Sequence, residues 1–255
     1  MHAAMTPAEP PHILILTPVK DAQPWLEGYF ERILSLSYPR SHITLGMLES
    51  DSQDQTYERA QDGIRGAQRS LRSARLWRRD FGYQIPAGKP RHAGEIQWDR
   101  RAVLARSRNH LLFHALDDHD WVLWLDVDVI EFPDDLIERL LATGRDIVQP
   151  HCVLDYGGKT FDRNGWRDRG KHHLEDLRHE GTFAALHAVG GTVLWIKADL
   201  HRDGLIFPPF GYGRRSEYIR KPSGEIETEG LGMMALDMGL QIWGMPHFEV
   251  RHRRG

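Results

Sequence analysis

An unbroken apolar run, Trp121 to Leu125, leads directly into a short acidic sequence, Asp126-Val127-Asp128. A run of this kind is typical of a strand covered on both faces, as in a parallel sheet between two helical layers. The two carboxylates stand where that strand ends, and bare anions are costly to bury. A divalent cation would compensate their charge and offer coordination positions to phosphate oxygens. The arrangement predicts an enzyme that acts on a nucleoside diphosphate. The alternative is structural, since Asp-x-Asp also occurs in solvated turns and at helix caps.

Strand and helix patterns alternate through the first half of the chain. The predicted strands cover residues 13–16, 43–48, 74–78 and 121–125, and the predicted helices cover residues 25–36, 56–71 and 101–116. This alternation predicts an α/β, Rossmann-like fold with a mainly parallel mixed sheet flanked by helices. Ligands of such sheets bind at the carboxyl ends of the strands. The loop after residue 16, the polar turn at Asp51 and the acidic pair all fall at those ends.

The second half is less regular. Predicted helices cover residues 133–142 and 229–238, and predicted strands cover residues 146–149, 192–197 and 240–243. Residues 82–99 form a predicted loop, and Tyr156–Gly181, rich in Gly, Arg, His and Asp, a loop or lid. We expect residues 1–11 to be a disordered tail. Residues 12–255 are expected to form one domain, with a nucleotide-binding half over 12–130 and a sugar and acceptor half over 131–255.

Composition narrows the possible partners and compartment. The formal net charge of −3 over 255 residues offers no electrostatic attraction for nucleic acid or an anionic membrane. The single cysteine, Cys152, rules out an internal disulfide and suits a reducing compartment. The first residues lack the pattern of a secretory signal, and no apolar run is long enough for a membrane span. We therefore expect a cytoplasmic protein without a transmembrane segment.

Short motifs follow one another from Ile15 to His252. They are Ile15-Leu16-Thr17-Pro18, Ser50-Asp51, Asp80-Phe81-Gly82, Arg106-Ser107-Arg108-Asn109, Trp124-Leu125-Asp126-Val127-Asp128-Val129, Phe161-Asp162-Arg163-Asn164-Gly165-Trp166, Val189-Gly190-Gly191, Glu227-Thr228-Glu229-Gly230 and Pro246-His247 followed by His252. Their order and spacing resemble the Anp1/Mnn9-type mannosyltransferases of glycosyltransferase family 62, which have the GT-A fold. The resemblance implies metal-dependent transfer of a hexose, with mannose from GDP-mannose favoured, to a glycan or other hydroxyl acceptor with retention of configuration.

The resemblance also implies a metal site and a nucleotide pocket. Asp126, Asp128 and His252 correspond to the ligands of a divalent ion, and a mixed oxygen and imidazole set suits Mn²⁺. Without the resemblance, His252 reads as a surface residue of the basic tail. The nucleotide pocket corresponds to Thr17, Pro18, Asp51 and Asp80. A carboxylate at Asp51 can accept hydrogen bonds from a base or ribose, and its alternative role is to cap the following helix.

Arginines, glycines and a glutamate pair complete the predicted site. Arg106 and Arg108 are two residues apart on one predicted helix, so at most one faces the donor diphosphate, and we favour Arg108. Gly190 and Gly191 let the backbone approach a sugar closely or form a tight turn; the resemblance places them and Asp162 at the donor sugar. It places Glu227 and Glu229, with Asp128, at the reaction centre, although carboxylates also stabilise a helix start.

Two other functions stay open. A nucleotidyltransferase would attack the α-phosphorus, but it typically uses a basic or glycine-rich phosphate loop, and the first loop here has the single lysine Lys20. A non-catalytic nucleotide-sugar-binding subunit would not need a metal at the leaving group. Eukaryotic members of the family carry a membrane anchor and act in complexes, whereas this chain shows neither an anchor nor a stem, so acceptor and partners stay open.

Overall fold

The computed structural model describes residues 9–90 and 93–254. Its strands are β1 (Ile13–Val19), β2 (Ile43–Glu49), β3 (Ser73–Arg78), β4 (Trp121–Leu125), β5 (Val129–Glu131), β6 (Ile147–Val153), β7 (Ala184–Leu186), β8 (Val193–Lys197) and β9 (Ile242–His252). Its helices are α1 (Leu26–Ser35), α2 (Thr56–Ala67), α3 (Gly94–Ala115), α4 (Leu136–Ala142), α5 (Ala198–Arg202) and α6 (Glu227–Asp237), with short 3-10 helices η1 (Gln23–Trp25), η2 (Arg40–His42) and η3 (Leu174–Glu180).

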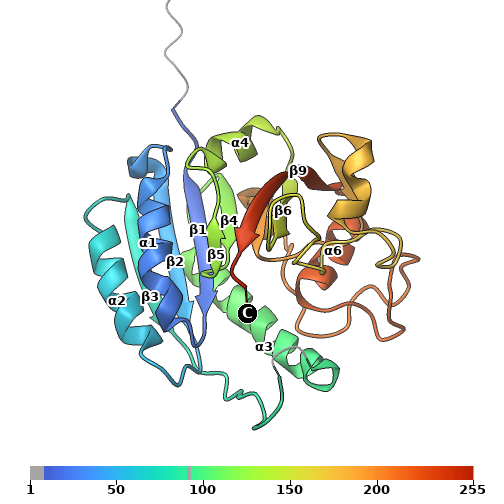
Figure 1. Ribbon diagram of the computed structural model, residues 1–255, viewed down its shortest axis with the longest axis horizontal. Coiled ribbons are helices and arrows are strands. Elements are labelled where there is room, and N and C mark those ends of the chain that lie inside the picture. Colours follow the sequence, from blue (N-terminus) through green and yellow to red (C-terminus); the bar gives the residue numbers. More distant parts are fainter. Residues whose placement is uncertain (1–8, 91–92, 255) are drawn as a thin grey trace, which may run out of the picture.

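One mixed sheet organises the described chain, in the order β3-β2-β1-β4-β8-β6-β9-β5, with β7 beside β9 (Figure 1). β1 pairs in parallel with β2 and β4, β2 with β3, and β6 with β9. β8 runs antiparallel to β4 and β6, and β5 and β7 run antiparallel to β9. Most strands therefore point one way, which confirms the predicted α/β class and mainly parallel mixed sheet.

Helices cover both faces of the sheet because successive strand residues point to opposite sides. Ile13 and Ile15 pack into the core formed with α1, α2 and α4. Leu14 and Leu16 pack into the second core, formed with α3, α5 and α6. The strand Trp121–Leu125 lies between these layers, and its residues from Val122 onward are buried, as the apolar run predicts. In the described residues no helix is both long and apolar enough to cross a membrane.

The largest difference from prediction concerns the last strand. The pattern predicts a strand over residues 240–243, whereas β9 continues to His252. Its register against β6 jumps from Pro150↔Met245 to His151↔Glu249, so the intervening residues, which include Pro246, bulge out of the ladder. A proline cannot donate to a ladder, and bulges are among the places where a strand tolerates one. The bulge lets β9 pass Pro246 and reach the edge where Asp128 lies.

Other boundaries shift less. α3 begins at Gly94, inside the predicted loop over residues 82–99, and α6 begins at Glu227 rather than residue 229. The Tyr156–Gly181 segment is irregular but contains η3. Of the tail predicted over residues 1–11, residues 1–8 lie outside the described residues. Pro11 is held in place, since its carbonyl accepts a hydrogen bond from the hydroxyl of Tyr38 at 2.8 Å.

A buried histidine behind the central strand links stability to pH. The Nδ1–H of His201 donates to the Leu205 carbonyl at 2.6 Å, and its Nε2 accepts the indole N–H of Trp124 at 3.3 Å, which requires the neutral ring. Burial lowers the pKa of His201 to about 4. An unfolded histidine titrates near 6.5, so the unfolded chain takes up a proton that the folded chain excludes. The His201 contribution to the free energy of unfolding is therefore complete above about pH 6.5 and decreases as the pH falls toward 4.

We expect the His201 contribution to fall by about 2 kcal/mol between roughly pH 7 and pH 5. Urea unfolding of His201→Gln should therefore show a shallower dependence on pH than the parent. His179→Gln is the matched control because that side chain is exposed. Equal pH slopes for the parent and His201→Gln would contradict the prediction.

Candidate active site

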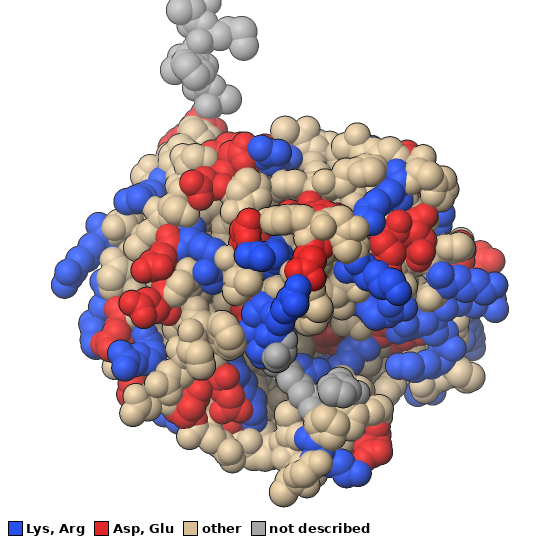
Figure 2. All heavy atoms as spheres, viewed as in Figure 1, with Lys and Arg blue, Asp and Glu red and all other residues tan. Residues whose placement is uncertain are grey.

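The acidic pair lies at the carboxyl end of β4, next to the end of β9. Val129 pairs with His252, and the Arg253 N–H donates to the Asp128 carbonyl at 3.1 Å. This brings His252 Nε2 to 3.0 Å from Asp128 Oδ1. Burial by itself lowers the pKa of His252, but the hydrogen bond and charge of Asp128 outweigh it and raise that pKa. Figure 2 shows this face hollowed beside the C-terminal end, with acidic and basic side chains together in the hollow.

The orientation of His252 keeps Nε2 toward the acidic pair. Its Nδ1 lies 2.8 Å from the Arg253 carbonyl, so Nδ1 carries the hydrogen. The ring of Phe161 stacks on it with 3.9 Å between ring centroids. When the ring is neutral, Nε2 is therefore the nitrogen with the lone pair, as a metal ligand requires.

Asp126 is a carboxylate whose pKa is shifted by its surroundings. Burial raises its pKa to about 6; the charge of Arg108 opposes this rise, while Asp128 and Asp162 add to it. Its Oδ1 lies 3.2 Å from Arg108 Nη2, and its side chain is 28% exposed. The acidic pair is thus a partly open concentration of negative charge with Arg108 beside Asp126 and Arg253 Nε 3.4 Å from Asp128 Oδ2.

The donor set fits a divalent cation in its chemistry. Two carboxylates and an imidazole suit Mn²⁺ or a similar ion, and a cation would relieve the repulsion that raises the pKa of Asp126. In this structure the ligand atoms of Asp126, Asp128 and His252 do not all lie within 4.8 Å of one another. In the part of the chain that the structure describes, the one set of three such atoms within 4.8 Å of one another is Glu9, His12 and His42. Binding would require Asp126 to turn from Arg108 toward Asp128.

Arg108 joins the acidic pair to the glutamate pair. Its Nε donates to Glu227 Oε1 at 3.0 Å, and its Nη2 donates to the Gly191 carbonyl at 3.3 Å as well as to Asp126. Its Nη1 is buried without a hydrogen-bond partner in the described structure. Arg106 lies on the exposed side of α3, where its Nε contacts the Ala102 carbonyl at 3.4 Å. The structure thus brings Arg108, and not Arg106, to the other predicted residues.

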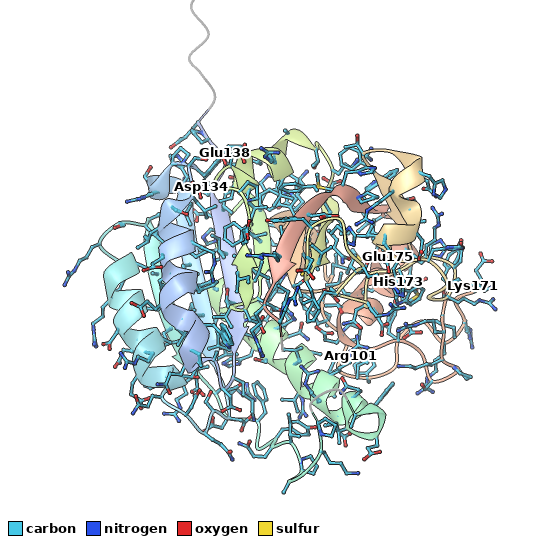
Figure 3. All side chains as sticks on the ribbon, viewed as in Figure 1. Arg101, Asp134, Glu138, Lys171, His173 and Glu175 are labelled. Atoms are coloured by element: carbon cyan, nitrogen blue, oxygen red, sulfur yellow. The ribbon has the colours of Figure 1, made fainter. Side chains whose placement is uncertain are left out.

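Glu227 and Glu229 are buried, and each forms ion pairs with arginine side chains. Arg101 contacts both carboxylates and donates to the Ile226 carbonyl at 2.8 Å. Figure 3 labels Arg101 on α3. Burial raises the pKa of Glu227, but Arg108 and Arg101 outweigh it and hold that pKa below its usual range. Glu227 also has a φ of 59°, a left-handed conformation that costs a non-glycine residue free energy. The surrounding contacts hold it there as an ionised acceptor.

Sequence reasoning missed three neighbours of this pair. Arg101 is one, and the others are Trp166, whose indole N–H donates to Glu229 Oε1 at 2.9 Å, and Arg220, which pairs with the same carboxylate. A signal existed for Arg101, because residues seven apart on a helix share a face and Arg101 stands seven before Arg108. Trp166 stands in the motif that begins at Phe161 but was given no role there, and no pattern was available for Arg220, which lies in an irregular segment.

The predicted sugar-binding residues form one tight contact. A side chain on Gly190 would place its Cβ 2.0 Å from Asp162 Oδ2, and one on Gly191 would meet Arg108 Nη2 at 2.6 Å. Asp162 Oδ2 accepts hydrogen bonds from the backbone N–H and the hydroxyl of Thr192, each at 3.0 Å. Neither glycine has a positive φ. Their lack of a side chain therefore permits close packing on Asp162 and Arg108.

Gly190→Ala should destabilise the protein by about 1–3 kcal/mol, since the new methyl group must displace the Asp162 carboxylate. Gly66→Ala is the matched control: it lies on α2 with nothing within 4 Å of the added Cβ. That control should be neutral or stabilising by up to about 1 kcal/mol. Chemical unfolding of both variants checks this, and equal stability of Gly190→Ala and the parent would contradict it.

The predicted nucleotide residues lie at the same edge with their polar groups largely engaged. Thr17 is fully buried; its hydroxyl donates to the Leu125 carbonyl at 2.8 Å and so accepts from Tyr29. Pro18, half-buried, follows it in β1. The Asp51 carboxylate accepts the N–H groups of Phe81 at 3.0 Å and Gly82 at 2.8 Å.

Asp51 therefore does not cap α2, which begins at Thr56 without a side-chain cap. Its own N–H donates to Asp80 Oδ1 at 2.8 Å, and its φ of 55° is left-handed. Asp51 and Asp80 together fasten the loop after β3 to the end of β2. Both carboxylates thus line the sheet edge on which the donor nucleotide was predicted to bind.

Comparisons with known proteins agree with this architecture. The Anp1 family model matches residues 2–180. The mannan polymerase complex subunit mnn9 of Schizosaccharomyces pombe is 30% identical over 94% of this chain and 79% of its own length. The mannan polymerase II complex anp1 subunit of the same yeast is 28% identical over 94% of this chain, which spans 63% of that relative.

Solved structures share the fold. The mannosyltransferase PcManGT of Pyrobaculum calidifontis, in complex with GDP-Man and Mn²⁺, has a TM-score of 0.59 at 16% identity, over 98% of this chain and 59% of that one. GalNAc-T7 with UDP, GalNAc and Mn²⁺ has a TM-score of 0.60 at 12% identity, over 96% of this chain and 44% of that one. The fold is that of the GT-A glycosyltransferases. The chain belongs to the Anp1 family.

Proposed function

We propose that this protein is a divalent-metal-dependent mannosyltransferase that moves mannose from GDP-mannose to a glycan or other hydroxyl acceptor with retention of configuration. The observation that carries the proposal is the contact of His252 with Asp128, 3.0 Å apart, at the carboxyl end of β4. The PcManGT complex with GDP-Man and Mn²⁺, a protein of the same fold, supports the choice of donor and ion.

Each residue takes a role that its surroundings allow. Asp126, Asp128 and His252 would hold Mn²⁺, which supplies Lewis-acid stabilisation of the departing diphosphate. Arg108 would donate its unpartnered Nη1–H to the same phosphate oxygens. The ionised Glu227, which shares Arg101 with Glu229, would accept hydrogen bonds from sugar hydroxyls and orient the ring. The sugar–phosphate bond would break with its electron pair left on the GDP oxygen, the acceptor oxygen would bond the anomeric carbon, and the acceptor proton would pass to the departing GDP or to solvent.

Thr17, Pro18, Asp51 and Asp80 would bind the nucleoside at the ends of β1, β2 and β3. Asp51 would act through the loop that its carboxylate holds as well as by contact. Gly190, Gly191 and Asp162 would form the wall against the donor sugar.

His252→Ala should weaken Mn²⁺ binding by a smaller factor than loss of either aspartate, because two carboxylates remain. Calorimetric titration of Mn²⁺ in the presence of GDP measures this. His179→Ala, at an exposed histidine outside the site, serves as the control. Unchanged Mn²⁺ affinity in His252→Ala would remove His252 from the ligand set.

A thermal-shift screen of nucleoside diphosphates and nucleotide sugars with Mn²⁺ tests the identity of the donor. A ligand that binds the folded state raises the midpoint of thermal unfolding by mass action. GDP-mannose should give the largest shift, and release of GDP from it should depend on Mn²⁺. A larger shift with a uridine donor would overturn the guanosine assignment. Release of pyrophosphate from a nucleoside triphosphate would instead indicate the nucleotidyltransferase alternative.

A second candidate is a non-catalytic nucleotide-sugar-binding subunit. It is favoured by the engagement of Asp126 with Arg108 and by relatives that are named as subunits of complexes. Mn²⁺-dependent hydrolysis of the donor above the buffer rate would exclude it, and binding without any turnover would support it.

A further inference from the structure

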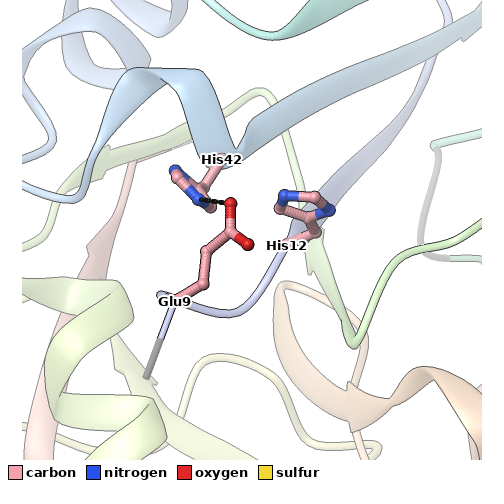
Figure 4. A group of neighbouring side chains, drawn as sticks. All are labelled: Glu9, His12 and His42. Carbon is pink, nitrogen blue, oxygen red and sulfur yellow. Dashed lines mark hydrogen bonds and ion pairs between the residues drawn. The ribbon is translucent and has the colours of Figure 1, made fainter. Parts of the chain in front are cut away.

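A second group of metal-ligating side chains lies at the opposite end of the strands, where β1 and β2 begin. His12 and His42 immediately precede β1 and β2, and the register Ile13↔Ile43 sets these two histidines side by side. Glu9, from the segment leading into β1, completes the group (Figure 4). β1 spans seven residues from this end to the candidate active site, which at about 3.3 Å per residue separates the two by roughly 20 Å.

The geometry is close to that of a metal site. One ligand atom from each of the three residues lies within 4.8 Å of the others. His42 Nε2 is 3.4 Å from Glu9 Oε1, and the two imidazole rings are 4.9 Å apart between centroids. Ligand atoms of a tetrahedral zinc site are about 3.3 Å apart, given Zn–N and Zn–O bonds near 2 Å. Glu9 is 81% exposed, so its carboxylate can close the remaining gap without repacking the core.

Neighbouring groups position both histidines. Ser41 Oγ lies 3.0 Å from His42 Nδ1, and Asp118 Oδ2 lies 3.9 Å from His12 Nδ1. Asp120 Oδ2 accepts the backbone N–H of His12 at 2.7 Å. Partners on the second ring nitrogen are the usual means of orienting a metal-bound histidine. Here Ser41 engages Nδ1 of His42 and leaves its Nε2 toward Glu9, whereas Asp118 attracts His12 from beyond hydrogen-bond distance.

We propose that Glu9, His12 and His42 form a zinc site, with water in the fourth position. Two imidazoles and a carboxylate suit Zn²⁺ rather than Mg²⁺ or Ca²⁺, which prefer all-oxygen shells. The bound ion would clasp the segment before β1 to the start of β2. Because the site is remote from Asp128, its role is structural and independent of donor chemistry.

Calorimetric titration of the metal-stripped full chain with Zn²⁺ tests the proposal. We expect His12→Ala/His42→Ala to bind one fewer equivalent than the parent, and Glu9→Gln, an exposed change that leaves the core intact, to bind at least about tenfold more weakly. His110→Ala/His114→Ala is the matched control, since these rings also lie close together, 4.0 Å apart between centroids, on α3. Zn²⁺ should also raise the melting midpoint of the parent and the control by more than that of the double variant.

The two proposals fail separately. Mn²⁺-dependent GDP release should persist in Glu9→Gln, which leaves the residues of the candidate active site untouched. Equal zinc stoichiometry and affinity in the parent and His12→Ala/His42→Ala would overturn the site, and so would absence of zinc binding by the parent. Loss of GDP release in Glu9→Gln would overturn the independence of this site from donor chemistry.

Discussion

Replacing Asp128 with alanine should reduce Mn²⁺-dependent GDP release from GDP-mannose by at least about a hundredfold, because a lost metal ligand removes several kcal/mol of stabilisation of the leaving group. The side chain is 13% exposed at the end of a strand and belongs to no hydrophobic core cluster. We therefore expect the variant to fold, with a circular dichroism spectrum like that of the parent. Steady-state assays at saturating Mn²⁺ measure the effect on turnover.

Asp62→Ala is the matched control, since Asp62 is an exposed carboxylate of α2 that pairs with Arg65. It should release GDP at the parent rate. If folded Asp128→Ala turned over donor as fast as Asp62→Ala, Asp128 would have no part in catalysis and the proposed metal site would be wrong.

Arg101→Ala should lower the free energy of unfolding by about 3–5 kcal/mol, the usual cost of removing one partner from a buried charge network. Arg101 is 9% exposed in its side chain and pairs with Glu227 and Glu229, which are 2% and 0% exposed. Without it, Arg108 and Arg220 remain to offset two desolvated carboxylates as well as Asp126. Urea or guanidinium unfolding near neutral pH measures the loss.

Arg106→Ala provides a control of the same residue type on the same helix. Its guanidinium is exposed, so a change within about 0.5 kcal/mol is expected. The same variant tests its predicted contact with nucleotide: because Arg106 faces away from the site, GDP affinity should be unchanged. Equal destabilisation by Arg101→Ala and Arg106→Ala would show that the buried pairs contribute nothing to stability.

The sheet and its polar edge could be predicted because the relevant signals are local. The apolar runs at β1, β2 and β4 each span a few residues, and alternation with amphipathic helices specifies parallel strands. Parallel strands end at the same side of a sheet. The positions of Asp51 and the acidic pair at strand ends therefore suffice to predict that they lie on that side. The end of β9 could not be predicted in this way, since Pro246 interrupts the pattern and the bulge that accommodates it exists through pairing with β6.

Contacts among the site residues divide in the same manner. That a carboxylate pair follows the central strand is written in adjacent residues, and so is the placement of Arg106 and Arg108 on different faces of one helix. The partner of each buried charge cannot be predicted from adjacent residues. Arg101 and Glu229 are 128 positions apart in the chain, and Arg253 and Asp128 are 125 apart. No periodicity extends over such distances.

The residue pattern therefore accounts for the class of fold, the edge that carries the polar groups and the residue types available there. Tertiary packing decided that His252 faces Asp128, that Asp51 fastens a loop, and that Arg101, Arg108 and Arg220 share the buried carboxylates. The physical reason is range: backbone propensity and side-chain alternation act over a few neighbouring residues. Compensation of a buried charge depends on whichever distant segment the folded chain brings against it.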